Sequence, residues 1–112
     1  MTGPGSGNSA GNAIGIIETR GVVALTAGIE AMMKTADVQT IAVERISSGY
    51  LAAAVRGSLA AVRQAVAAGS KAVEEYGELR AAQAYPKPHE HSAALLANGT
   101  SDRLARAIEA AP

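Results

Sequence analysis

The sequence predicts an α+β domain in which a four-stranded, mainly antiparallel sheet is covered by two helices, with a short further helix at the C-terminus. Short runs rich in β-branched residues alternate with two longer runs whose apolar residues recur every three or four positions. Their order is β-α-β-β-α-β, which is typical of helices packed on a mostly antiparallel sheet. The 112 residues suffice for one such domain and leave no room for a second.

The first strand and the first helix are predicted before residue 38. The Ile-rich run at residues 13–18 indicates a strand that turns at residues 19–21. Glu30 and Lys34 lie one turn apart on the exposed flank of the helix that follows. Its apolar face consists of Val22, Leu25, Ile29, Met32, Met33 and Ala36.

A hairpin and a second helix are predicted next. Residues 38–46 and 50–55 indicate two strands joined by a tight polar loop at residues 47–49. Ser58 is the expected N-cap of the helix, and Gly77 is placed to end it. The apolar stripe of this helix is Leu59, Val62, Val66, Gly69, Val73 and Tyr76.

The last predicted strand covers residues 79–85 and stops at a rigid corner, residues 86–89, that contains two prolines. Near the C-terminus, Thr100 or Ser101 is placed to cap a short helix that carries Leu104 and Ile108.

These elements divide the chain into three segments. Residues 1–12 form a leader rich in Gly, Ser and Asn that we expect to be disordered, and it lacks the pattern of a signal peptide. Residues 13–89 form the domain, and residues 90–112 form a helical C-terminal tail.

Composition narrows the function. The chain is 48% hydrophobic but has no Phe or Trp, so small aliphatic residues build the core and the elements should pack closely. The formal net charge is zero, and the charges are interspersed, which disfavours nucleic acid and anionic membranes as partners. With no cysteine, the chain has no disulfide, thiolate metal site or cysteine nucleophile, and a cytoplasmic location is expected.

No constellation for catalysis stands out. His89 and His91, with Glu90 between them, offer at most two ligands for a metal such as zinc, which requires four. Glu74 and Glu75 end an amphipathic helix, where a solvated face is the simpler interpretation. We therefore predict no catalytic residue, no metal and no cofactor, and we predict that the protein is not an enzyme.

Five segments in register resemble the hexamer-forming shell proteins of bacterial microcompartments, over residues 13–89. The segments match the opening strand, the end of the first helix, the pore hairpin, the start of the second helix and the proline corner of that family. They are residues 13–21 (AIGIIETRG), 30–34 (EAMMK), 44–49 (ERISSG), 55–58 (VRGS) and 85–89 (YPKPH).

The resemblance implies a flat hexamer with a narrow central pore, located in the shell of a cytoplasmic microcompartment. It places Ser47, Ser48 and Gly49 at the pore, and it places Glu30, Lys34 and Lys87 at the edge where hexamers meet. The implied partners are further copies of the chain, other shell proteins, encapsulated enzymes and small polar metabolites that cross the pore.

The sequence departs from the family pattern at three positions. Ser47 stands where a glycine is usual, Lys87 replaces the more usual arginine, and Tyr50 is bulkier than the apolar residue common after the loop. Arginine would bind in a planar, two-pronged manner that lysine cannot reproduce.

Simpler interpretations stay open at this stage. Taken alone, residues 47–49 are an ordinary turn and the two lysines are solvated side chains. The rival function is a small-molecule-binding regulatory trimer, because small α+β domains also form such assemblies.

Overall fold

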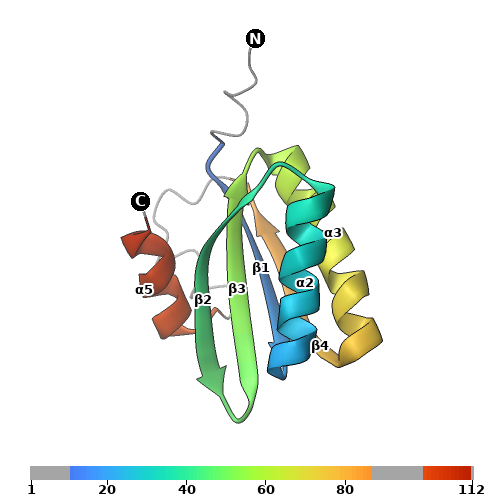
Figure 1. The fold of residues 1–112 in the computed structure, drawn as a ribbon. Coiled ribbons are helices and arrows are strands. Elements are labelled where there is room, and N and C mark those ends of the chain that lie inside the picture. Colours follow the sequence, from blue (N-terminus) through green and yellow to red (C-terminus); the bar gives the residue numbers. More distant parts are fainter. Residues whose placement is uncertain (1–10, 87–99, 112) are drawn as a thin grey trace.

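The computed structural model describes residues 11–86 and 100–111. The elements follow the predicted order, and a short C-terminal helix completes the fold (Figure 1). They are β1 (Ala13–Arg20), α2 (Val22–Thr35), β2 (Gln39–Ser47), β3 (Tyr50–Gly57), α3 (Leu59–Tyr76), β4 (Glu78–Tyr85) and α5 (Asp102–Ala110). The predicted α+β class is confirmed. The leader expected at residues 1–12 lies almost wholly outside the described residues.

The four strands form one sheet in the order β2-β3-β1-β4, and every neighbouring pair is antiparallel. Strand β1 is therefore central and pairs along its length with both β3 and β4. It extends two residues beyond the predicted end at Glu18, because Thr19 and Arg20 also find partners on both sides. Every residue of β1 except Arg20 is buried, which explains why its sequence is a nearly continuous apolar run.

Two separate cores lie on the two faces of the sheet. Helices α2 and α3 cover one face, while α5 packs on the other, nearest to β2 (Figure 1). Because successive side chains of a strand point to opposite faces of the sheet, they alternate between the two cores. The core between the sheet and helices α2 and α3 includes Ile17, Met32, Ala53, Val55, Val62 and Val73. The core under α5 includes Ile14, Ile16, Ala52, Ala54, Tyr85, Leu104 and Ile108.

Glycines allow α2 and α3 to approach each other closely above the sheet. A Cβ atom on Gly69 would lie 2.7 Å from Cγ of the fully buried Met32. On Gly28 it would lie 2.7 Å from both Ile17 Cδ1 and Val73 Cγ2. These distances are too short for real atoms, so the close packing expected from the small-residue composition is realised at this crossing.

Side-chain caps fix the starts of α3 and α5. The Ser58 Oγ accepts a hydrogen bond from Ala61 N at 3.1 Å, as predicted. Of the two candidate caps for α5, Ser101 fills this position and accepts from Leu104 N at 3.2 Å. Thr100 is instead buried, with its hydroxyl 3.3 Å from that of Tyr85, so it joins α5 to the end of β4.

Replacing Leu104 with alanine should lower the free energy of unfolding by about 2–5 kcal/mol, because the side chain is fully buried beneath α5 and the change leaves a cavity. Urea denaturation at a fixed chain concentration measures the loss. Arg106→Ala is the matched control: its side chain is 76% exposed and its ion pair with Asp102 is worth only about 0.3–0.5 kcal/mol. Equal effects of the two changes would contradict the second core.

Candidate functional site

The β2–β3 hairpin ends in a two-residue tip, Ser48 and Gly49. Both have positive φ, 52° and 85°, as a type I′ turn requires. Ser47, predicted to lie in the loop, is instead the last residue of β2 and pairs with Tyr50. The loop is therefore shorter than the sequence suggested, because tight two-residue turns match the twist of antiparallel strands.

The tip presents neutral polar groups to solvent. Ser47, Ser48 and Gly49 are all exposed, and they offer hydroxyl groups and backbone amides without formal charge. The tip also projects beyond the end of the sheet (Figure 1). The tip is held at Gly49, whose carbonyl oxygen accepts a hydrogen bond from the backbone N–H of Gly21 at 3.1 Å.

The same hydrogen bond brings the start of α2 beside the hairpin tip. Gly21 directly precedes α2, and Lys34 lies in the last turn of that helix. At a rise of 1.5 Å per residue, Lys34 is roughly 20 Å along the helix from the hairpin end. The tip and Lys34 therefore occupy opposite ends of the domain.

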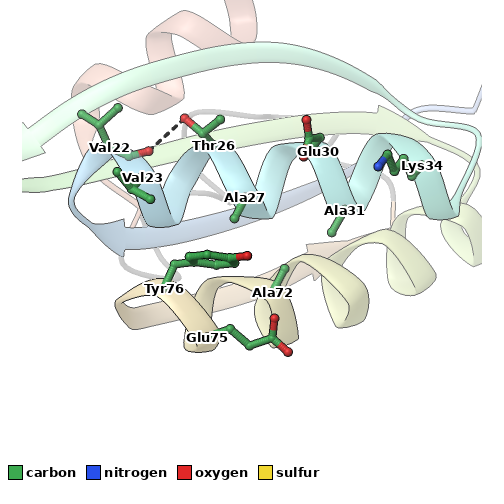
Figure 2. Close-up of a pocket in the computed structure, with 10 residues that line it drawn as sticks. All are labelled: Val22, Val23, Thr26, Ala27, Glu30, Ala31, Lys34, Ala72, Glu75 and Tyr76. Carbon is green, nitrogen blue, oxygen red and sulfur yellow. Dashed lines mark hydrogen bonds between the residues drawn. The ribbon is translucent and has the colours of Figure 1, made fainter.

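Lys34 belongs to an exposed flank that the structure shows to be grooved. A hollow of about 520 Å³ runs between α2 and α3 (Figure 2). Three large apolar side chains in it are well exposed: Val22 (63%), Val23 (66%) and Tyr76 (61%). Clustered exposed apolar side chains of this kind mark contact surfaces between proteins.

Glu30 and Lys34 lie on the polar side of this groove, one turn apart, as the helical spacing predicted (Figure 2). Both are exposed, and among the described residues no carboxylate lies within ion-pair distance of the Lys34 ammonium. Its charge is favourably placed at the negative end of the helix dipole. Within residues 11–86 and 100–111, the Lys34 ammonium is therefore open to solvent and not held by a carboxylate.

Other candidates cannot be placed beside these residues. Lys87, His89, Glu90 and His91 lie outside the described residues. Within residues 11–86 and 100–111, no three acidic, His or Cys side chains come together in a way that could hold a metal ion. Likewise, no helix in this part of the chain has the length and apolar character needed to cross a membrane.

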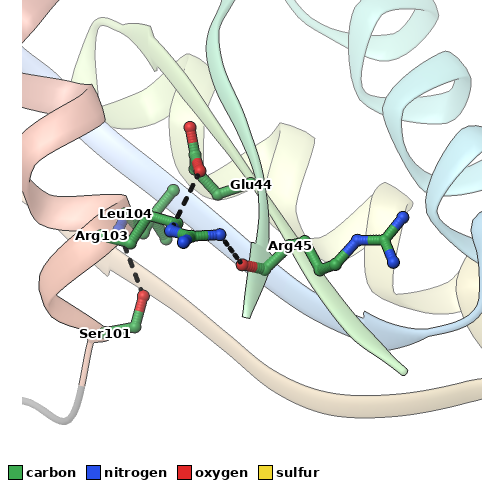
Figure 3. A network of polar contacts seen from close by, with 5 residues as sticks. All are labelled: Glu44, Arg45, Ser101, Arg103 and Leu104. Atoms are coloured by element: carbon green, nitrogen blue, oxygen red, sulfur yellow. Dashed lines mark hydrogen bonds and ion pairs between the residues drawn. The ribbon is translucent and has the colours of Figure 1, made fainter. Parts of the chain in front are cut away.

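A polar network anchors α5 to the edge strand β2 (Figure 3). The Arg103 guanidinium donates to the carbonyl oxygen of Arg45 at 3.4 Å, and its Nε lies 3.9 Å from the Glu44 carboxylate. The Arg45 side chain points away from this network (Figure 3). It lines a hollow of about 210 Å³ next to Gly21 and Gly49, so a cation accompanies the neutral tip.

Sequence reasoning missed a group of charged residues around Tyr50, on the sheet beside the hairpin. Arg80 lies with its guanidinium carbon 4.7 Å from the centre of the Tyr50 ring. The sequence contained only a weak signal for this group. Tyr50 stands at a position that is usually apolar, and the charged residues Glu18 and Arg20 alternate at the end of the first strand. Only the strand register brings these residues together.

Comparison with known proteins identifies the family. A family model described as the BMC domain matches residues 13–88, from the start of β1 to beyond the end of β4. The bacterial microcompartment shell protein PduA of Citrobacter freundii is 37% identical over 80% of this chain and 96% of its own length. The chain belongs to the bacterial microcompartment shell protein family.

Two further similarities agree with this assignment. The shell protein EutM of Salmonella typhimurium is 44% identical over 69% of this chain and 80% of its own length. The crystal structure of a microcompartment protein from Desulfitobacterium hafniense superposes with a TM-score of 0.64 and 32% identity, over 71% of this chain. This chain spans 46% of the length of that protein.

Family membership confirms the resemblance seen in the sequence. The matched region contains both candidate surfaces, the hairpin tip and the α2 flank. Because its relatives are shell proteins, the chain is a structural protein of a microcompartment shell and not an enzyme, as predicted.

Proposed function

We propose that this chain assembles into cyclic hexamers, which tile a flat layer of a microcompartment shell in the cytoplasm and leave a central pore for small polar metabolites. The observation that carries the proposal is the placement of two exposed surfaces at opposite ends of α2. Copies arranged around an axis beside the hairpin tip bring the tips together at the centre. The Lys34 ends then point outward, where neighbouring rings meet.

The pore is assigned to Ser47, Ser48 and Gly49. Six copies of the tip would surround the axis with hydroxyl groups and backbone amides, a neutral polar lining. Such a lining can replace part of the hydration shell of a small polar solute and excludes solutes wider than the opening. Arg45, beside each tip, adds a positive rim that favours anionic metabolites.

The edge contact is assigned to Lys34, Glu30 and Lys87. A lysine at such an edge can lay its methylene stem along the next ring and donate its ammonium hydrogens to carbonyl oxygens there. Other shell proteins that share the same edge would join the same layer, and the encapsulated enzymes would lie on one side of it.

The assembly itself is tested by the mass of the protein in solution together with negative-stain imaging. We expect a stable six-chain disc that forms sheets, since an interface of standard size or larger, about 800 Å² per partner, keeps free monomers rare at micromolar concentration. A stable monomer would contradict the proposal. A compact trimer stabilised by a small ligand would favour the regulatory alternative.

Ser48→Leu should reduce the flux of small polar solutes across assembled shells, because an apolar side chain would narrow the opening and remove a hydroxyl. Ser48→Gly is the control, since it removes the hydroxyl without adding bulk and suits the positive φ. Flux is measured by the conversion of external substrate by an enzyme enclosed in the shell. Equal flux through wild-type and Ser48→Leu shells would rule out the pore assignment.

Lys34→Ala should abolish sheet formation while leaving the six-chain mass and the melting temperature unchanged. Substitution of an exposed residue usually changes folding stability by no more than about 0.5 kcal/mol. A small loss of binding energy at each edge, in contrast, adds up over all the edges that hold the layer together. Imaging and light scattering measure the two properties separately. The control is Lys71→Ala, an exposed lysine on α3. If the variant still forms sheets, Lys34 is an ordinary solvated side chain. If its rings dissociate, Lys34 lies at the interface between chains within a ring.

A further inference from the structure

Five polar side chains gather beside the hairpin, on the sheet face that carries α5: Glu18, Arg20, Tyr50, Glu78 and Arg80. Strand register explains three of them, because Arg20 of β1 pairs with Tyr50 of β3 on one side and with Glu78 of β4 on the other.

A β-bulge supplies Arg80. Glu18 pairs with Ala81 and Thr19 pairs with Leu79, so Arg80 is the extra residue between the two pairs. Bulges redirect a side chain away from regular alternation. Here the bulge places Arg80 against both Glu18 and Tyr50.

Tyr50 is at the centre of these contacts. The guanidinium carbons of Arg80 and Arg20 lie 4.7 and 5.5 Å from the centre of its ring, within the range of cation–π attraction. Its hydroxyl donates to the Glu78 carboxylate at 3.1 Å. Arg80 is held in turn by Glu18, with Nε 3.8 Å from a carboxylate whose side chain is only 10% exposed.

These contacts restrain the strand that leaves the hairpin tip. Tyr50 is the first residue of β3, directly after Gly49. On the other strand, Arg103 of α5 holds the Arg45 carbonyl oxygen, but the pairing of β2 with β3 shifts between Arg45 and Ser47, so the residues nearest the tip are less regularly paired. The tip is therefore fixed mainly from the β3 side, by Tyr50 and by the hydrogen bond from Gly21 to Gly49.

We propose that Tyr50 is a positioning residue whose ring, held by Arg20 and Arg80, fixes the orientation of the Ser48–Gly49 tip. Where six tips surround an axis, this orientation decides how far each Ser48 hydroxyl projects and so sets the aperture. The second statement rests on the pore proposed above, whereas the first concerns a single chain.

Amide hydrogen exchange of the full-length protein tests the first statement. The amide of Gly21 reports the tip directly, because it donates to Gly49, and peptides covering residues 44–51 report the hairpin. Tyr50→Leu and Arg80→Gln should each accelerate this exchange about five- to tenfold, the size expected when one cation–π contact and its associated polar contacts are lost from a local opening equilibrium.

Two variants separate positioning from general destabilisation. Tyr50→Phe retains the ring and should stay within about twofold of the wild-type exchange, although it loses the hydroxyl. Arg63→Gln alters an exposed arginine on α3 and should leave the hairpin unchanged. The proposal is overturned if Tyr50→Leu and Arg80→Gln exchange like the wild type, or if Tyr50→Phe exchanges as fast as Tyr50→Leu.

Solute flux through assembled shells tests the second statement. We expect Tyr50→Leu shells to differ from wild-type shells in the size of solute they pass, and Tyr50→Phe shells to match the wild type. If Ser48→Leu alters flux and Tyr50→Leu loosens the tip without altering it, the control of aperture is overturned. If neither variant alters flux, the pore itself fails, while faster exchange in Tyr50→Leu still supports the positioning of the tip.

Discussion

The burial of β1 on both faces is the constraint on which the rest of the structure depends. Ile17 points into the core beneath α2 and α3, whereas Ile14 and Ile16 point into the core beneath α5. A strand covered on both faces has little freedom of register, because a slip of one residue would exchange its two apolar sets. Strands β3 and β4 pair with β1 on either side. The register of β1 therefore fixes where the hairpin, the start of α2 and the bulge at Arg80 lie.

Small side chains make this arrangement compact. A core without Phe or Trp is built mainly from alanine and aliphatic side chains, and glycines at the α2–α3 crossing let the two helices lie close to each other. Three residues of the predicted apolar stripes, Val22, Met33 and Tyr76, are nevertheless exposed. Val22, Val23 and Tyr76 gather on the outer side of the α2–α3 pair, while Val43 is 49% exposed on the edge strand β2. The cluster on the α2–α3 pair is a surface suited to contact with another protein.

The elements were predictable where the signal was local, and less so where it depended on distant residues. The three- and four-residue spacing of apolar side chains predicted both long helices. Ser58 predicted the start of α3, because the hydrogen bond of an N-cap joins residues close in the sequence. Hairpin type was harder, since Ser47 joins β2 only by pairing with Tyr50. The face covered by α5 and the grouping of charges around Tyr50 depend on how separate strands pair. Local sequence patterns do not predict that pairing. Pore and edge roles involve other copies of the chain and came from the family resemblance alone.

The left-handed backbone at Ser48 has a consequence for how such a protein can diversify. A residue other than glycine, asparagine or aspartate costs about 1–2 kcal/mol in this conformation, a cost that Ser48 already bears, and bulky or β-branched side chains are tolerated still less there. Bulky and β-branched side chains are thus strongly selected against at the most exposed point of the hairpin. The chemistry of the hairpin end would therefore change more readily through neighbours with ordinary strand geometry, such as Ser47 and Arg45, than through the residue at the tip itself.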